Sequence, residues 1–176
     1  MAASMRLTLS LSEAQDRTSV ERAIAEMRMG RPVLLEAEGG SAIVQGIEDL
    51  TTDRVAQLDV LAAGAAGGAR LVLPAARLRR LGLPRDGDGT VPLPRIEADR
   101  IATLAFGLEA RIDAPVRAAA AIDTDALELA RLALALPAVV LIPVGAAISV
   151  DATVLRVAAD AVRGYRAARV RDLKIV

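Results

Sequence analysis

Carboxylates are the side chains in this sequence best suited to chemistry, because histidine and cysteine are both absent. Histidine is the commonest general base and transition-metal ligand, and cysteine supplies the thiolate nucleophile and a usual zinc ligand. Any reaction must therefore use carboxylates, arginines, hydroxyls, Lys174 or Tyr165. Oxygen ligands of this kind suit a hard cation such as Mg²⁺, whereas a zinc centre would lack its usual nitrogen and sulfur ligands.

Three carboxylates stand next to the ends of predicted elements. Glu36 and Glu38 follow a predicted strand, and Asp123 stands just before a predicted helix. For Asp123 we favour a structural interpretation, because Asp is a preferred N-cap residue. Asp125, in the first turn, would likewise be stabilised by the helix dipole. The sequence therefore predicts neither a metal site nor a cofactor, with a Mg²⁺ site as the alternative.

Two other clusters have structural interpretations that require no ligand. Gly64 and the pair at 67–68 fit neither the P-loop nor the dinucleotide-binding spacing, which favours a tight turn. Three arginines within residues 77–80 form a basic cluster on a short predicted helix. We interpret that cluster as a solvated face, with a partner surface as the alternative.

Composition limits the class of protein. The 176 residues fit one domain, and 53% of them are hydrophobic while only 1% are aromatic, so the core must be aliphatic. Formal net charge is zero without a basic block, which argues against nucleic acid and anionic membrane as partners. There is no long apolar signal region, and the apolar run 138–148 is broken by Pro143 and Gly145. We therefore expect a soluble, cytoplasmic protein.

Helix and strand patterns alternate along the chain, which predicts an α/β (mixed α+β) fold: a mixed sheet flanked by helices. Residues 1–17 have no strong period and are expected to be a lead-in, or a short strand at 7–11. A capping-box pattern at 18–21 predicts the start of the first helix, and Gly30 its end. We therefore expect one domain over residues 18–176.

The remaining elements follow from periodicity and from turn residues. The apolar, β-branched run 138–144 is typical of a central buried strand. Proline, glycine and aspartate predict a surface loop at 83–94. Strands are expected at 32–35 and 42–47 (together a hairpin), 69–73, 138–144 and 173–176, and helices at about 53–64 (capped by Thr52 or Asp53), 74–82, 96–106, 124–136 and 153–168.

Four stretches carry recognisable motifs. They are V-E-R-A-I through G-R-P-V (20–33), a helix, glycine turn and strand leading to R-L-R-R-L-G-L-P (61–84), A-L-E-L-A-R-L-A with L-P-A-V-V (126–140), and D-L-K-I-V (172–176). In this order and spacing they resemble 3,4-dihydroxy-2-butanone-4-phosphate (DHBP) synthase, an enzyme of riboflavin biosynthesis. The resemblance spans nearly the whole chain, and it implies the fold of that family more directly than its activity.

The metal-binding segments of that family are altered here. Its acidic loop, which ends in R-E-N-E-G-D, binds Mg²⁺ and handles protons of the sugar phosphate. The matching loop, residues 36–42, reads E-A-E-G-G-S-A and keeps only Glu36 and Glu38. The metal-ligating histidine of the family's G-H-T-E-A motif is matched by Asp123. These changes remove most of the expected metal ligands.

The family's phosphate-binding segment, R-x-G-G-V-L-x-R, is also missing. Here Arg117 runs through alanines directly into the helix. Arg117, Thr124 and Asp125 are the remaining candidates for substrate binding. Metal, proton transfer and positioning each contribute separately to such a reaction. Because all three are affected, we expect no catalytic residue in this domain.

The resemblance therefore implies a pseudoenzyme kept for its shape. Some bacterial GTP cyclohydrolase II proteins carry such a degenerate synthase-like domain ahead of a zinc-dependent catalytic domain, and this chain resembles that module. We expect a homodimerising N-terminal part, or a partner, of GTP cyclohydrolase II. One alternative is a divergent active Mg²⁺-dependent synthase that acts on ribulose 5-phosphate through Glu36, Glu38 and Asp123. The other is a standalone ligand-binding or regulatory protein that reuses the cleft.

Overall fold

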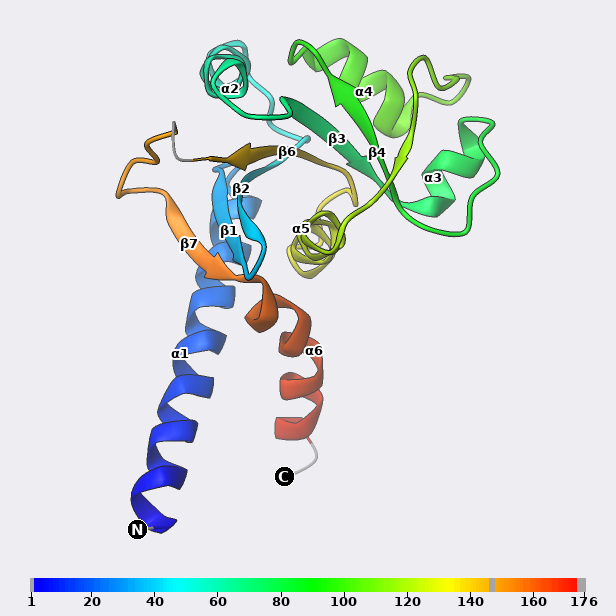
Figure 1. Ribbon diagram of the computed structural model, residues 1–176. Coiled ribbons are helices and arrows are strands. Elements are labelled where there is room, and N and C mark those ends of the chain that lie inside the picture. Colours follow the sequence, from blue (N-terminus) through cyan, green and yellow to red (C-terminus); the bar gives the residue numbers. More distant parts are fainter. Residues whose placement is uncertain (1, 146–147, 174–176) are drawn as a thin grey trace.

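A seven-stranded mixed sheet forms the middle layer of the described protein, with helices on both faces (Figure 1). The computed structural model describes residues 2–145 and 148–173, and their side chains over 12–145 and 148–170. Its elements, in chain order, are α1 (Ala2–Arg28), β1 (Val33–Ala37), β2 (Gly40–Gly46), α2 (Thr52–Ala63), β3 (Ala69–Leu73), α3 (Ala75–Arg80), β4 (Gly89–Leu93), α4 (Ala98–Phe106), β5 (Arg117–Ala118), α5 (Ala121–Leu132), β6 (Val139–Val144), β7 (Leu155–Ala158) and α6 (Ala159–Leu173).

The strand order is β5-β4-β3-β6-β2-β1-β7. β1 pairs in parallel with β7, and the other neighbours pair antiparallel. β6 lies in the middle of the sheet, which confirms the prediction of a central buried strand. β1 and β2 form the predicted hairpin, with Leu34 opposite Ile43. The expected α/β fold with a mixed sheet is therefore confirmed.

Side-chain alternation along the strands divides the aliphatic core into two layers. Leu35 and Val44 face the layer under α1, α5 and α6. Leu34 and Ile43 face the layer under α2, α3 and α4. Fully burying one such leucine stabilises the fold by about 1.5–3 kcal/mol. Phe106 is 51% exposed, so neither layer depends on it, and the aliphatic core expected from composition is confirmed.

The first helix is longer than expected. α1 begins at Ala2, so the predicted lead-in or strand over residues 1–17 is wrong for the described part of that segment. The predicted cap at 18–21 is wrong as well, because the Thr18 hydroxyl donates to the Ala14 carbonyl one turn earlier. No glycine or proline interrupts residues 2–28, and extending a helix costs far less than nucleating one.

The predicted surface loop at 83–94 contains a strand. In β4, Val91 and Leu93 are buried and pair with β3, with Pro92 opposite Arg70. β5 is only two residues long and pairs with Gly89 and Thr90, so the edge of β4 is unpaired at Pro92. An unpaired edge is where a strand tolerates proline.

The C-terminal region also differs from the prediction. The helix expected at 153–168 is preceded by β7, whose Val157 is buried, and α6 then runs from Ala159 to Leu173. Leu173 is therefore helical, not the start of a strand, and residues 174–176 lie outside the described chain. β7 extends the sheet because its backbone pairs with β1, and a local helical pattern does not reveal that pairing.

Three helix starts move by a few residues. Thr51 caps α2, with its hydroxyl accepting from the Arg54 amide at 3.3 Å, so neither Thr52 nor Asp53 is the cap. α4 begins at Ala98, and α5 begins at Ala121 and ends at Leu132. Such shifts follow from caps that periodicity alone locates poorly.

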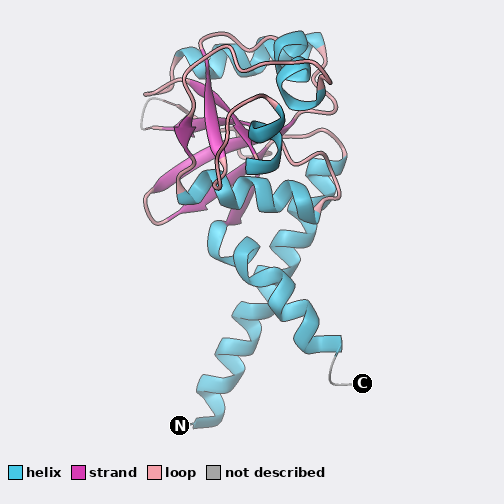
Figure 2. Cartoon of the chain, turned by 90° about the vertical axis from the view of Figure 1, so that its right-hand side faces the viewer, coloured by secondary structure: helices cyan, strands magenta, loops and turns pink. Residues whose placement is uncertain are grey.

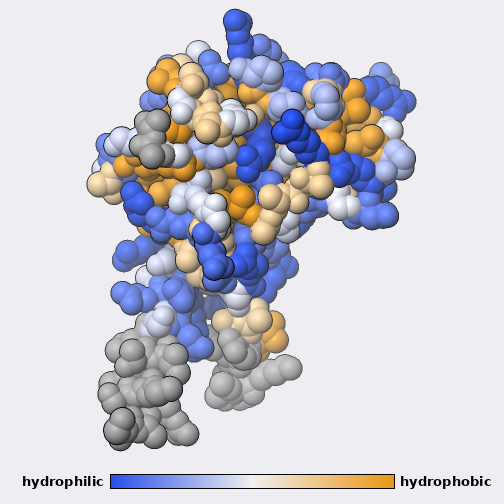
Figure 3. Space-filling model, in the orientation of Figure 1, coloured by the Kyte–Doolittle hydropathy of each residue, from blue (hydrophilic) through white to orange (hydrophobic). Residues whose placement is uncertain are grey.

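α1 and α6 extend from the body in the same direction (Figure 2) and contact each other. The face seen in Figure 3 mixes hydrophilic and hydrophobic residues. Among the described helices, none is both long enough and apolar enough to cross a membrane.

Candidate functional site

A cleft of about 400 Å³ opens between the β1–β2 turn, the start of α5 and the end of β6. It is the place where the acidic-loop segment and the start of the predicted helix come together. Among its lining residues Arg70 alone is charged. The others are Ala37, Gly39, Gly40, Ser41, Ala42, Ala120, Ala121, Ile122, Pro143 and Val144.

Asp123 is buried beside this cleft, with 2% of its surface exposed. Its Oδ1 accepts from Arg70 Nε at 2.7 Å, and its Oδ2 accepts from the Ala120 amide at 2.8 Å. Ala120 is the N-cap of α5, so the interpretation of Asp123 as the cap is wrong. As the third helical residue, Asp123 makes the return hydrogen bond of a capping box. Both oxygens are thus occupied, and Arg70 balances the charge.

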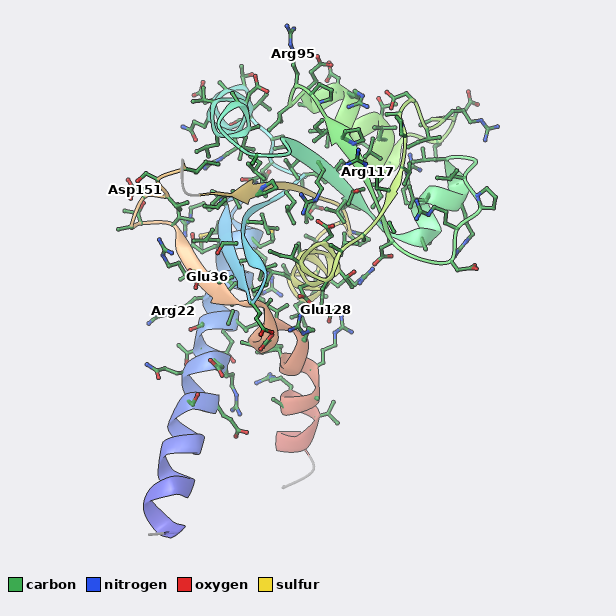
Figure 4. All side chains as sticks on the ribbon, in the orientation of Figure 1. Arg22, Glu36, Arg95, Arg117, Glu128 and Asp151 are labelled. Carbon is green, nitrogen blue, oxygen red and sulfur yellow. The ribbon has the colours of Figure 1, made fainter. Side chains whose placement is uncertain are left out.

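Glu36 points to the opposite face of the sheet from Asp123. Leu35 packs in the layer under α5, whereas Leu34 packs in the other layer, and Glu36 shares the face of Leu34 by alternation. Its Oε1 accepts from Arg156 Nη1 on β7 at 3.0 Å. Figure 4 shows Glu36 beside β7. Glu36 is therefore an exposed cross-strand ion-pair partner and does not line the cleft.

The three metal candidates are consequently not gathered into one site. Glu38 is exposed in the β1–β2 turn and is not a lining residue of the cleft. Within the described residues, no group of three or more acidic side chains could hold a metal ion. The candidates Glu36, Glu38 and Asp123 differ in direction and in partners.

Arg117 lies far from the loop of Glu36. It belongs to β5 at one edge of the sheet, and β1 is five strands away, roughly 24 Å at the usual spacing between strands. Figure 4 shows Arg117 next to β4. Thr124 is exposed and donates to the Ala120 carbonyl at 3.4 Å. Neither residue lines the cleft.

Asp125 joins α5 to α6. Its side chain is 4% exposed and accepts from Arg163 Nη1 at 2.5 Å. Arg163 also pairs with Asp160, and Glu128 accepts from Arg166 Nε at 2.5 Å. Burial raises the pKa of Asp125, and Arg163 partly offsets that effect. The placement of Asp125 supports helix packing instead of substrate binding.

Arg70 is the residue of the cleft that was not predicted. It lies in β3, where Leu71 and Leu73 face the other layer of the core, so Arg70 faces α5. The available signal was a charged residue inside an otherwise apolar strand, A-R-L-V-L, because a buried charge requires a partner.

The basic cluster at 77–80 is partly structural. Arg77 donates to the carbonyls of Leu104, Thr103 and Gly107 at 2.7, 3.0 and 2.8 Å, which caps the C-terminal end of α4. Burial lowers the pKa of Arg77 from its ordinary value. Of the expected solvated face, Arg79 and Arg80 remain exposed.

The similarity of this chain to known proteins was found by comparing structures. No protein-family model and no curated protein matches the sequence. A two-domain DHBP synthase from A. baumannii superposes with a TM-score of 0.63 at 17% identity, covering 84% of this chain and 57% of that one. The synthase of Candida albicans gives 0.63 at 15% identity, covering 84% and 96%. A synthase in complex with two magnesium ions gives 0.54 at 18% identity, covering 85% and 89%.

These likenesses show the fold: the chain has a DHBP synthase-like fold. It spans only 57% of the length of the two-domain protein. The cleft of about 400 Å³ is large enough for a small molecule. Beside it, the Arg70 guanidinium is a fixed positive group, and its charge neutralises the Asp123 carboxylate. The lining residues of the cleft include no carboxylate, so they offer no obvious ligand set for a cation.

Proposed function

We propose that this chain is a non-catalytic DHBP synthase-like domain, a pseudoenzyme that serves riboflavin biosynthesis through its shape. The observation that carries the proposal is the ion pair between partly buried Arg70 and buried Asp123, at 2.7 Å. By the motif resemblance, Asp123 takes the place of the family's metal-ligating histidine. A divalent cation there would meet the guanidinium as a repulsive charge and would have to displace it from Asp123.

The other requirements of the synthase reaction point the same way. An active Mg²⁺-dependent synthase would need Glu36, Glu38 and Asp123 around one cation, and Glu36 pairs with Arg156 on the other face of the sheet. It would also need a group that binds phosphate, and the candidate for that role, Arg117, lies in β5 at the edge of the sheet, outside the cleft. The geometry therefore supports the non-catalytic reading better than the active one.

The partner that we propose is a GTP cyclohydrolase II domain, with this domain as a homodimeric, cytoplasmic scaffold. The proposal rests on the resemblance to the degenerate N-terminal domains of such proteins. A structural neighbour that is a two-domain protein is consistent with a domain of this fold being joined to another. α1 and α6 project beyond the body and would present helical surface to such a partner (Figure 1).

The proposal is tested by purifying the chain with and without GTP cyclohydrolase II from the same organism. We expect multi-angle light scattering to give a dimer of this chain, and a mixed complex with the cyclohydrolase. Calorimetry with Mg²⁺ should give no binding heat at millimolar concentration. A monomer that forms no complex would contradict the scaffold role. Tight Mg²⁺ binding that Asp123→Asn removes would contradict the loss of the metal site.

A further inference from the structure

Arg70 is anchored in a way that leaves hydrogen-bond donors for the cleft. Its Nε–H is taken by Asp123 at 2.7 Å. No described residue accepts a hydrogen bond from either of its Nη groups, although its side chain is only 24% exposed and lines the cleft. A guanidinium has five N–H donors in a rigid fork, and two parallel N–H donors of that fork match the two oxygens of a carboxylate. The anchor therefore orients an Arg fork toward the cavity.

The charge at this position favours a singly charged anion. Asp123 already neutralises much of the Arg70 charge, and no other residue lining the cleft is charged. A phosphate dianion would place two further negative charges near buried Asp123. A monocarboxylate adds one, which the free side of the guanidinium can accept with charge-assisted hydrogen bonds.

The walls of the cleft select the rest of the ligand. Ala37, Ala42, Ile122, Pro143 and Val144 present apolar surface, and Ser41 carries the one side-chain hydroxyl among the lining residues. A sugar would bury hydroxyl groups there without partners, which is costly. An aliphatic chain would instead gain by leaving water. A cavity of about 400 Å³ lies within the range of small-molecule sites.

We infer that this cleft binds a small aliphatic monocarboxylate, with its carboxylate on Arg70 and its hydrocarbon body against the apolar wall. This inference goes beyond the proposed scaffold function and does not require it. Turnover of ribulose 5-phosphate would refute the scaffold proposal, whereas the titrations below test the carboxylate site by its own binding signal.

The probe is 4-methylpentanoate, titrated into the full chain and followed by NMR of the arginine side-chain N–H groups. We expect saturable binding with a Kd of about 1 mM or tighter, as suits a ligand of eight non-hydrogen atoms. The Arg70 Nε–H signal should shift in step with saturation. The isosteric amide, 4-methylpentanamide, should bind at least about tenfold more weakly, because it cannot form the charge-assisted hydrogen bond. Inorganic phosphate should also bind at least about tenfold more weakly, because it brings excess negative charge close to Asp123. Equal binding of the amide, tighter binding of phosphate, or no binding of the acid overturns the inference.

Variants locate the site. Arg70→Met combined with Asp123→Asn removes the guanidinium without leaving a lone buried charge, and it should weaken 4-methylpentanoate binding about tenfold or more. Arg117→Met is the matched control, because it removes an exposed arginine outside the cleft, and its Kd should stay within about twofold of the original. Unchanged affinity in the double variant overturns the inference. If that variant does not fold, the comparison of acid and amide on the unaltered chain still decides the question.

Discussion

Replacing Arg70 with methionine should destabilise the fold by about 3 kcal/mol. The substitution leaves Asp123, 2% exposed, with the Ala120 amide as its remaining hydrogen-bond donor. Removing one partner of a buried ion pair typically costs about 3–5 kcal/mol, and we take the lower end because Arg70 itself is 24% exposed. In a domain of this size, about 3 kcal/mol corresponds to a fall in Tm of roughly 6–12 °C.

Urea denaturation followed by circular dichroism measures this effect. Arg156→Met is the matched control, since Arg156 and Glu36 form an exposed pair that should contribute less than about 1 kcal/mol. Adding Asp123→Asn to Arg70→Met should recover about 1.5–3 kcal/mol, because the uncompensated charge is gone. A loss below about 1 kcal/mol in Arg70→Met, or a double variant that loses the sum of both single effects, would refute the reasoning about the pair.

Two further predictions concern strain and titration. Leu134 has φ of 58° and is 84% exposed, so Leu134→Gly should raise the free energy of unfolding by about 0.5–1 kcal/mol in the same urea assay, and an unchanged or lowered value would contradict strain there. By carbon-detected NMR, Asp113 should titrate below and Asp125 above the ordinary value of 3.8, because the Arg100 hydrogen bonds lower the pKa of Asp113 and burial raises that of Asp125. The stabilisation from Asp113 is therefore present above about pH 4 and lost as the pH falls. Arg100→Met should return the pKa of Asp113 toward 3.8 and remove that contribution. Asp125 behaves in the opposite way: its contribution to folding is largest below its unfolded pKa and is lost as the pH rises.

The parts of the fold that local patterns specify were predictable. The run at β6 is apolar throughout, and Gly30, with φ of 66°, ends α1 as expected. Patterns failed where pairing or continuity decides the structure. Leucines alternate over residues 7–11 as in a strand, yet the segment belongs to α1, the helix that packs on the core through residues 20–27. Pro92 suggested a loop, yet its neighbours are buried against β3.

The site was less predictable than the fold. Arg70 and Asp123 are 53 residues apart in sequence, and only the packing of α5 on β3 brings them together. Glu36 and Asp123 were expected around one cation only in the alternative of an active synthase. Leu34 and Leu35 are both apolar, so the sequence did not reveal that Glu36 faces the other side of the sheet.

The non-catalytic assignment is tested most directly by the conversion of ribulose 5-phosphate by the purified chain, with and without Mg²⁺, beside an authentic DHBP synthase. We predict no product above the rate without protein in either condition, because the carboxylates that would bind the cation are not gathered and Asp123 is paired with Arg70. Mg²⁺-dependent turnover that is abolished by Asp123→Asn or Glu38→Gln would contradict the account and show that the cleft catalyses the reaction with a different set of ligands.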